Sequence, residues 1–428
     1  MAGSSLGDKI ADEMSGKVFV RRASGLVRDF STFDLFVVNM SDCCVGFTFL
    51  TGALWAASLY PDAKLTPLII IGAVMLVFVG IVYSFLSAAM PRAGGDYVWV
   101  GRVLHPFLGF VANWAHTWGM LVAAGLFGWL IVDSIASVLL TSGLQFGNQG
   151  LQAAGEALRE KMAYVGIGTL VIGLVTVIQI VGKKFLRNLL KVLFWIAMIS
   201  LTIHLFVFLT AEPDSFINNF NNLMSQYTNS DNSYQYVIDL AKEKGNTASP
   251  IGTWAGTWLA LPLAFQFYIG FTATAYVAGE AKEPMKSQPI AILATLGVSM
   301  IILLLGMNVM YNLVGREFIN ALAFLDSLGE NPVPVGVYST FFSGLVSPNP
   351  ILEFISAIGM LVWPLMLIIV LMMLPVRNLF AWSVDWLLPY SVAKVDRHGT
   401  PVTATLIIAV ITWLIMMMYL LSLIHISE

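Results

Sequence analysis

Long apolar runs alternate with shorter polar segments along almost the whole chain. Nine of these runs come near the ~20 residues that an α-helix needs to cross the hydrocarbon of a bilayer. The third run is too long for one upright crossing, so we expect it to tilt or to continue past the membrane surface. The nine predicted spans are Phe33–Leu59, Pro67–Met90, Phe107–Leu140, Tyr164–Val181, Leu189–Thr210, Trp254–Gly279, Ile290–Val314, Ile351–Pro375 and Val402–Leu423.

The sixth run stops being uniformly apolar halfway along. Pro262 and Gly270 lie within it, and Thr272 and Thr274 follow where hydrocarbon is expected. A helix in lipid has to satisfy its own backbone, so an interrupted helix is tolerated only where it lines a cavity enclosed by protein. In transporters such cavities hold the substrate. We therefore expect the sixth run to be broken, with Gly270 as the break point.

The first run carries a second interruption, where Asp42 stands between Ser41 and a pair of cysteines. An ionisable group in the membrane costs about 2.5–3.5 kcal/mol on insertion scales and is a functional-site hypothesis by default. The alternative is that Asp42 caps a half-helix or pairs with another span. Ser41 and Gly46 would let the backbone open here, which favours function. The first and sixth runs would each begin a five-span unit, and breaks at corresponding positions of two halves point to a transport site.

The composition agrees with a polytopic membrane protein. Hydrophobic residues make up 58% of the chain and charged residues only 11%, whereas a soluble protein carries roughly 25% charged residues. Mean hydropathy is +0.81. No basic run suggests a nucleic-acid partner, and the adjacent Cys43 and Cys44 provide neither a disulfide framework nor a metal site. The polar N-terminus, Met1–Arg28, does not resemble a cleaved signal peptide.

Lys and Arg residues are distributed unevenly between the two sides. With the N-terminus inside, sixteen of the 22 basic residues fall in inner segments and six in outer segments. Because cytoplasmic loops are enriched in Lys and Arg, we expect residues 1–32 to form a cytoplasmic segment of a multi-pass protein of the cell membrane.

Two longer segments then fall on the outer side. Residues 212–250 are rich in Asn and Ser, and we expect them to form a lid or spacer in which Tyr236–Lys242 makes a short surface helix. Arg316–Pro350 contains several prolines and is expected to pack partly on the outer face.

The sequence shows no signature of an enzyme. It lacks a Gly-rich loop followed by Lys-Ser/Thr, a His-Glu-x-x-His motif and a Gly-x-Ser-x-Gly motif. No ATP-binding domain is present, so an ion gradient or an exchange partner would have to drive transport, and we expect no cofactor or metal. Broken helix ends present N–H groups to a carboxylate and C=O groups to an ammonium or a cation. A zwitterionic amino acid satisfies both.

Three other polar residues lie in predicted spans. Asp133, late in the third run, is a candidate gate or coupling residue, with pairing inside the bundle or a position near the membrane interface as the alternatives. His116 and His204 have apolar neighbours and no companions at metal-ligand spacing. We expect each histidine to be a hydrogen-bonded core residue.

Three segments in order resemble the amino acid–polyamine–organocation permeases. Ala89–Arg102 contains Pro-Arg-Ala-Gly-Gly-Asp-Tyr, which is similar to the Pro-x-x-Gly-Gly-x-Tyr signature of that family. Phe265–Phe271 with Glu280–Pro284 resembles the family's broken sixth helix and its Glu-x-x-x-Pro exit. Arg377–Pro389 is similar to the segment after helix eight. The likeness covers about residues 33–420.

The resemblance implies an all-α LeuT-type fold of two inverted five-helix repeats, with substrate held by unwound parts of helices one and six. The first repeat would span about residues 33–210, followed by an outer loop at 212–250 and a second repeat at about 252–423, together a transporter domain at 33–423. The implied substrate contacts are Ser41, Asp42, Cys43, Cys44, Val45, Gly46, Phe47, Tyr268, Ile269, Gly270, Phe271 and Thr272. The coupling or gating candidates are Asp42, Asp133 and Glu280.

The chain departs from the family pattern in several ways. The family's first helix commonly opens through a Gly-x-Gly pattern, whereas here the stretch is Asp42-Cys43-Cys44-Val45-Gly46. Thr272 stands where many members carry Glu, and Leu193–Ala197 occupies the depth at which some proton-coupled members carry a Lys in helix five. Asp42 would then carry the coupling proton or bind a cationic amine. The family usually has ten core helices, so nine spans predict an incomplete second repeat. Leu421–Glu428 lacks a flanking anchor, and we expect the natural chain to continue; an ordinary outer C-terminus is the alternative.

The leading hypothesis is a secondary active transporter, a symporter or exchanger, for amino acids or related amines. It would work by alternating access and would be coupled to H⁺, Na⁺ or a counter-substrate. The alternatives are a permease for another small organic or inorganic cation, and a transporter-like membrane sensor or structural subunit.

Overall fold

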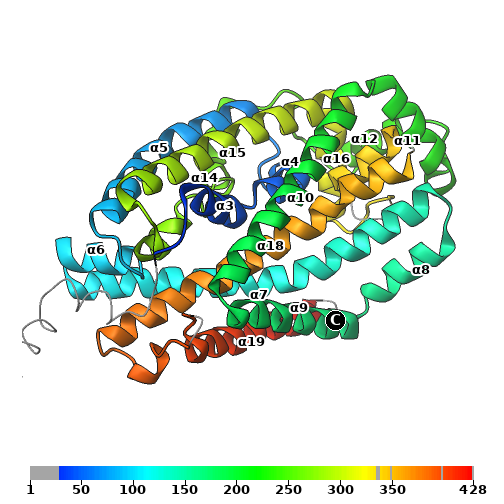
Figure 1. Cartoon of the computed structure of the whole chain (residues 1–428). Coiled ribbons are helices and arrows are strands. Elements are labelled where there is room, and N and C mark those ends of the chain that lie inside the picture. The colour runs from blue at the N-terminus through cyan, green and yellow to red at the C-terminus, as the bar shows by residue number, and fades with distance from the viewer. Residues whose placement is uncertain (1–27, 334–337, 348, 397–398, 427–428) are drawn as a thin grey trace, which may run out of the picture.

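The protein is built from α-helices and short 3₁₀ helices (Figure 1). The computed structural model describes residues 28–333, 338–347, 349–396 and 399–426. In these ranges there are two isolated β-bridges, Phe30–Ala281 and Ala63–Thr253, and no strand. The predicted all-α class is therefore confirmed. Of the expected N-terminal segment 1–32, residues 1–27 lie outside the described residues.

The helices alternate between long, apolar elements and short connecting ones. In chain order they are α3 (Thr32–Cys43), α4 (Val45–Leu59), α5 (Leu65–Ala89), α6 (Asp96–Val103), α7 (Pro106–Gln145), α8 (Gln149–Leu158), α9 (Lys161–Val181), α10 (Lys183–Thr210), α11 (Pro213–Thr228), α12 (Ser233–Glu243), α13 (Trp254–Leu259), α14 (Leu261–Gln266), η1 (Ala273–Glu280), α15 (Pro284–Val314), α16 (Arg316–Ser327), α17 (Ser339–Val346), α18 (Pro350–Val384), η2 (Tyr390–Val392) and α19 (Val402–Ile426).

Eight helical segments in the described part of the chain are long and apolar enough to cross a membrane. They match eight of the nine predicted spans, the first being the α3–α4 pair at Thr32–Leu59. The remaining predicted span, Trp254–Gly279, is not continuous. It consists of α13, α14, an irregular stretch and η1, which is the form expected of a broken span. The inverted-repeat relation between the two halves stays a prediction.

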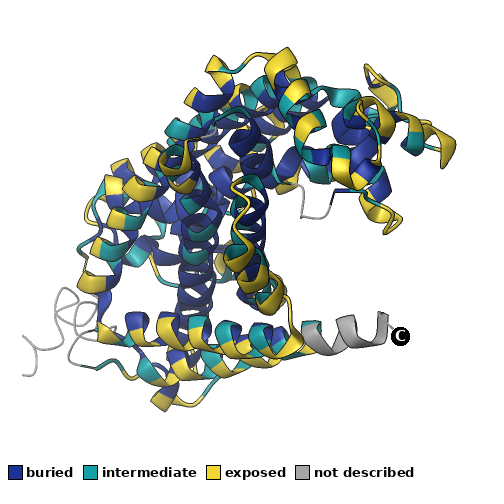
Figure 2. Cartoon of the chain, turned by 90° about the vertical axis from the view of Figure 1, so that its right-hand side faces the viewer, coloured by how far each residue is buried: buried dark blue, intermediate teal, exposed yellow. Residues whose placement is uncertain are grey.

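The α3–α4 segment and α18 form the centre of the molecule. In their most apolar windows 89% and 83% of the residues are buried, against 28–50% in the other six segments. Figure 1 shows α5 and α15 side by side along one edge and α7, α9 and α19 along the other, with α10 and α18 between them. Figure 2 shows the same division as dark central helices and an outer surface that is largely exposed. Apolar residues on these outer helices would face lipid.

Two helices extend beyond the predicted spans. α7 is 40 residues long and continuous, so the third apolar run does continue as one helix. α18 has 35 residues and runs through Pro364 and Pro375 to Val384. Arg377–Ser383 therefore lies inside a helix rather than after one, which corrects the predicted end at Pro375. Proline is tolerated in a membrane helix when neighbouring elements compensate for the lost hydrogen bond, and α18 is packed on most sides.

The predicted outer loop 212–250 is largely helical, because α11 and α12 occupy most of it. The short helix predicted at Tyr236–Lys242 is part of α12. On α11, Phe216, Phe220 and Met224 recur every four residues and are fully buried, so this Asn-rich segment still has one apolar helical face. These aromatic rings pack against Tyr234 and Phe318. We call the end of the molecule that carries α11, α12 and α16 the α12 face (Figure 1).

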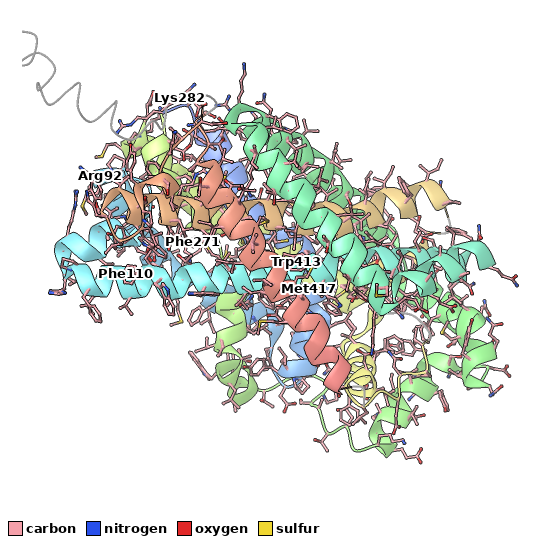
Figure 3. All side chains as sticks on the ribbon, turned by 90° about the horizontal axis from the view of Figure 1, so that it is seen from below. Arg92, Phe110, Phe271, Lys282, Trp413 and Met417 are labelled. Atoms are coloured by element: carbon pink, nitrogen blue, oxygen red, sulfur yellow. The ribbon has the colours of Figure 1, made fainter. Side chains whose placement is uncertain are left out.

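The opposite end carries α6 and the residues around Glu280, and we call it the Glu280 face. Arg92 and Lys282 both lie at this end (Figure 3). The chain entering α3 is fixed here, because the backbone N–H groups of Asp29 and Phe30 donate to the Glu280 carbonyl oxygen at 3.0 and 3.1 Å. Ser31 then begins α3 through a capping box with Asp34.

Candidate functional site

The first apolar run is broken at Cys44. This residue has φ 49° and ψ 37°, a left-handed conformation, and separates α3 from α4. Left-handed backbone costs a residue with a β-carbon roughly 1–2 kcal/mol, so packing has to hold Cys44 in place. The break lies inside the predicted Ser41–Phe47 stretch. It leaves the carbonyl end of α3 and the N–H end of α4 facing one another, and no side chain caps the N-terminus of α4.

The sixth run is broken twice. α13 ends at Leu259 and α14 begins at Leu261, one residue before Pro262. A second irregular stretch extends from Phe267 to Thr272, and Gly270 has φ +91° there. Gly270 thus adopts the conformation that glycine tolerates best, at the position predicted for the break.

The two breaks meet in the structure. A β-carbon placed on Gly270 would lie 2.6 Å from both the carbonyl carbon and the Oδ2 atom of Asp42. The Cys43 thiol is 3.9 Å from the Phe267 carbonyl oxygen and 3.5 Å from the Ser299 hydroxyl of α15. The predicted partnership between the first and sixth runs is therefore a direct contact between their irregular segments.

Asn39 joins the same two segments one turn away. Its Oδ1 accepts a 2.8 Å hydrogen bond from the Thr274 backbone N–H at the start of η1. No side chain within η1 caps that N-terminus, so a side chain of α3 supplies the cap for the irregular sixth segment. Thr274 also exchanges two hydrogen bonds with Gln288 of α15.

The side chains between Tyr268 and Thr272, in the second irregular stretch of the sixth run, have different surroundings. The Tyr268 hydroxyl donates to the Ile69 carbonyl of α5 at 2.8 Å. Phe271 is buried and packs beside Gly80 of α5, while Ile269 is 57% exposed and Thr272 is half-buried. The backbone at Gly270, rather than the predicted side chains of Tyr268 and Phe271, is what faces the first break.

The predicted residues of the first break are closely packed. The Ser41 hydroxyl donates to the Val37 carbonyl within α3 at 2.6 Å. Val45 and Phe47 are buried, and the Phe47 ring contacts Phe127 of α7. Gly46 lies directly under the indole of Trp363 from α18, leaving no space for a β-carbon. The Trp363 Nε1 atom has no hydrogen-bond partner among the described residues.

Asp42 is 8% exposed, and its Oδ1 atom has no hydrogen-bond partner in the part of the chain that the structure describes. It takes part in none of the ion pairs formed by the described residues. Among those residues no group of three or more His, Cys, Asp and Glu side chains is arranged to hold a metal ion. A buried carboxylate of this kind is costly unless a proton or a cation neutralises it.

Glu280 lies in a buried ion-pair cluster. Its carboxylate is 3.0 Å from Lys183 Nζ at the start of α10 and 3.0 Å from Arg377 Nε near the end of α18. Asp29 lies 3.5 Å from Lys183 and 3.1 Å from Arg187. Four segments are thereby joined at the Glu280 face: the entry to α3, the end of η1, α10 and α18.

Asp133 lies on the side of α7 nearer the α12 face. Its two carboxylate oxygens accept hydrogen bonds from the Tyr164 hydroxyl at 3.3 Å and the Tyr338 hydroxyl at 2.8 Å. Burial, and secondly the nearby Asp133 charge, raises the pKa of Tyr338, so this phenol remains a proton donor. Asp133 thus connects α7 to α9 and to the segment before α17.

The Pro-x-x-Gly-Gly-x-Tyr segment leads into a second buried polar network. Asp96 accepts hydrogen bonds from Asn113 Nδ2 at 2.7 Å and from the Tyr276 hydroxyl at 3.0 Å. The indole of Trp382 donates to Asn113 Oδ1 at 3.0 Å, and His116 stacks on Tyr276. The network connects α6, α7, η1 and α18 beside the Glu280 cluster.

A sequence model of the amino acid permease family matches residues 30–427. The chain belongs to this family. It is therefore a member of the amino acid–polyamine–organocation superfamily, as the three motifs implied.

Two named relatives are similar to this member of the amino acid permease family. The glutamate/serine transporter AimA of Bacillus subtilis (strain 168) is 27% identical over 289 residues, which cover 65% of this chain and 46% of AimA. The branched-chain amino acid permease BcaP of Lactococcus lactis subsp. cremoris (strain MG1363) is 22% identical over 347 residues, which cover 80% of this chain and 65% of BcaP. The chain thus matches less than two thirds of the length of each.

Several residues at the two breaks and near the Glu280 cluster were given no individual role from the sequence. Lys183 and Arg377 have the usual signature of basic residues flanking a span, and nothing in the pattern pairs them with Glu280. Asn39 and Asn113 are isolated amides in apolar helices, a signal that could have been used. Trp363 and Ser299 had no signal, because only the folded arrangement brings α18 and α15 against the first break.

Proposed function

We propose that this permease is a secondary active transporter that moves amino acids by alternating access at the junction of the two breaks. The contact between Gly270 and the Asp42 backbone carries the proposal. It brings two irregular membrane segments together, and irregular backbone at membrane depth is tolerated where it lines a substrate cavity. The family assignment supports the same activity.

The charges at the first break suit a zwitterion. The C-terminal end of α3 is the negative end of a helix dipole, and Asp42 adds a carboxylate there. Both favour the ammonium group of an amino acid. The N-terminus of α4 has no side-chain cap and is the positive end of a helix dipole, which favours the substrate carboxylate. Asp42 is thus assigned to the substrate's ammonium group.

The orientation follows from the basic residues. Arg92, Lys183 and Lys282 belong to the Glu280 face or its connections, and positive residues accumulate on the cytoplasmic side. The proposal places the Glu280 face and the N-terminus in the cytoplasm, the α12 face outside, and the protein in the cell membrane. Residues 33–210 and 252–423 would form the two repeats.

Exchange in proteoliposomes tests the function. Vesicles loaded with an unlabelled amino acid should take up the same amino acid, labelled, from outside. The panel of amino acids includes serine, glutamate and the branched-chain amino acids because the two relatives are named for them. A failure of exchange across the whole panel would overturn the transport proposal. Thermal stabilisation by amino acids without exchange would instead favour a sensor.

A second candidate is transport of an organic amine that lacks the carboxylate. The observation that favours it is the unpaired Oδ1 atom of Asp42, which a cationic amine would neutralise without any other partner. Competition separates the two candidates. For an amino acid transporter, the zwitterion should displace label more strongly than the corresponding decarboxylated amine, and the reverse order identifies an amine permease.

A further inference from the structure

His204 is a buried histidine in the membrane-spanning α10, away from both breaks. It is fully buried, between the rings of Phe49 on α4 and Phe208 on α10 at centroid distances of 5.3 and 4.6 Å. Phe49 lies about one turn beyond Gly46, and Ser356 lies about two turns before Trp363 on α18. His204 therefore occupies the layer next to the break, toward the α12 face.

One nitrogen of the imidazole is paired and the other is not. Nδ1 forms a hydrogen bond with the Ser356 hydroxyl of α18, so the sequence-based expectation of a hydrogen-bonded core residue is met at this atom. Nε2 has no hydrogen-bond partner in the described part of the chain, although it is buried. An unpaired polar atom in such a place costs free energy that packing alone does not offset.

A short chain of hydroxyl groups extends from the imidazole toward the α12 face. Ser356 Oγ lies 3.3 Å from Ser343 Oγ of α17. Ser200, one turn before His204, donates to the Ser356 carbonyl oxygen at 3.1 Å and accepts from the Gly359 N–H at 2.9 Å. The imidazole thus lies where α4, α10, α17 and α18 meet.

Ionisable groups on the surrounding helices do not pair with His204. The described ranges of α4 and α17 contain no Asp, Glu, Lys, Arg, His or Tyr. On α18 the side chain closest in sequence is Glu353, one turn before Ser356, and it accepts a 2.8 Å hydrogen bond from Ser142 of α7. The remaining ionisable residues on α3, α9, α10, α15 and α18 are Asp34, Asp42, Cys43, Lys161, Tyr164, Lys183, Lys184, Arg187, Lys191, Lys286, Tyr311 and Arg377. None of them forms an ion pair or hydrogen bond with His204 among the described contacts.

We propose that His204 is the proton-binding site that couples transport to a pH gradient, with the proton entering from the α12 face past Ser343 and Ser356. The proposal rests on the transport function proposed above. Histidine is the side chain whose ordinary pKa lies nearest neutrality, and an ionisable group buried in a membrane helix marks proton relays in transporters. The Ser356 hydroxyl passes the proton to Nδ1 of a neutral imidazole that carries its hydrogen on Nε2. Ser356 takes a replacement proton from the Ser343 side, so imidazole becomes imidazolium and no other group changes.

The site gives a division of roles. Asp42 holds the substrate's ammonium group at the break, and His204 holds the proton one layer away. Protonation places a positive charge beside the Phe49 and Phe208 rings, whose centroids lie 5.3 and 4.6 Å from that of the imidazole. Since Phe49 belongs to α4 and Ser356 to α18, protonation changes the contact between two helices that also meet at Gly46 and Trp363.

Uptake and exchange by His204→Gln in proteoliposomes test the proposal. Glutamine keeps a hydrogen-bonding group of similar length but cannot bind the proton. The vesicles carry a gradient of one pH unit, with the acid side at the α12 face. If one proton moves with each zwitterion, this gradient sustains up to about tenfold accumulation of the amino acid. We expect wild type to approach this limit and His204→Gln to lose the accumulation while it retains exchange at equal pH. His116→Gln, which alters the exposed histidine that stacks on Tyr276, is the matched control and should accumulate substrate as wild type does.

Accumulation by His204→Gln equal to that of wild type would overturn the proposal. The proposal would also be overturned if wild type exchanges substrate but a pH gradient never drives its uptake. In that case the transport function would still stand. Absence of exchange in wild type would remove the transport function and this inference together. If His204→Gln loses exchange as well, Ser356→Ala decides: it keeps the imidazole but removes its partner. The pH midpoint of proton-coupled uptake by Ser356→Ala should then differ from that of wild type by about half a unit or more. An unchanged midpoint would exclude His204 as the proton-binding site.

Discussion

Gly270 and Asp42 lie so close together that no other residue type fits at position 270. A β-carbon there would lie 2.6 Å from the Asp42 carbonyl carbon and 2.7 Å from its carbonyl oxygen. The backbone of one broken segment therefore passes directly over the backbone of the other, and glycine makes this approach possible.

Gly270→Ala should abolish exchange. The left-handed conformation alone would cost about 1–2 kcal/mol, and the overlap with Asp42 would force the two segments apart. Gly297→Ala on α15 is the control, since a β-carbon there meets nothing within 4 Å. The measurement is initial exchange rate together with melting temperature. If Gly270→Ala exchanges substrate at the rate of wild type, the contact between Gly270 and Asp42 is not part of the transport site.

Gly46→Ala should also lose exchange, for a different reason. The new methyl group would overlap the Trp363 indole, and overpacking of this kind typically costs about 1–3 kcal/mol. Because the indole is what it meets, Gly46→Ala combined with Trp363→Phe should recover part of the exchange rate. Trp363→Phe alone provides the reference. No recovery in the double variant would mean that the methyl group acts through another neighbour.

Glu280→Gln should lower the melting temperature strongly. It leaves Lys183 and Arg377 buried without their shared carboxylate, and removing one partner from a buried ion pair costs about 3–5 kcal/mol. Glu330→Gln removes the exposed pair with Lys244 and should change the melting temperature little. The comparison uses purified protein in the same detergent, and equal melting temperatures for the two variants would contradict a structural role for the Glu280 cluster.

Asp42→Asn should weaken substrate binding without removing the pH dependence of uptake. A hydrogen bond to a charged group contributes about 1.5–3 kcal/mol, so the KM for exchange should rise about tenfold or more. Asp133→Asn, whose carboxylate is held by two tyrosines, should change KM less. If Asp42→Asn keeps its KM but loses pH dependence, Asp42 carries the proton and the roles given to Asp42 and His204 are wrong.

The apolar runs predicted most of the fold, because each membrane helix has to satisfy its own backbone. The breaks were also predictable: Pro262, Gly270 and Asp42 conflict with an unbroken apolar helix. Helix ends were predicted less well. A basic residue such as Arg377 normally lies beyond the end of a membrane span. Here α18 continues past Arg377 because Glu280 neutralises its charge inside the protein.

Contacts between distant segments could not be predicted from the pattern. The substrate contacts expected of Tyr268 and Phe271 stay predictions, but the pattern gave no sign that both residues also contact α5, at the Ile69 carbonyl and beside Gly80. Residues 212–250 were expected to be a loop because Asn and Ser dominate the composition. The burial of Phe216 and Phe220 against Phe318 makes that segment helical, and this partner lies about one hundred residues further along the chain.

The backbone bridge between Phe30 and Ala281 has a practical consequence for anyone who labels or shortens this protein. Asp29 and Phe30 donate to the Glu280 carbonyl, and Lys282 donates back to the Phe30 carbonyl at 3.0 Å. Any force or bulk applied just before Asp29 is therefore transmitted to the end of the sixth segment. If the Glu280 face opens as the proposed alternating access requires, a fluorophore placed there would report on that opening, whereas an affinity tag fused directly to Asp29 would alter the exchange rate.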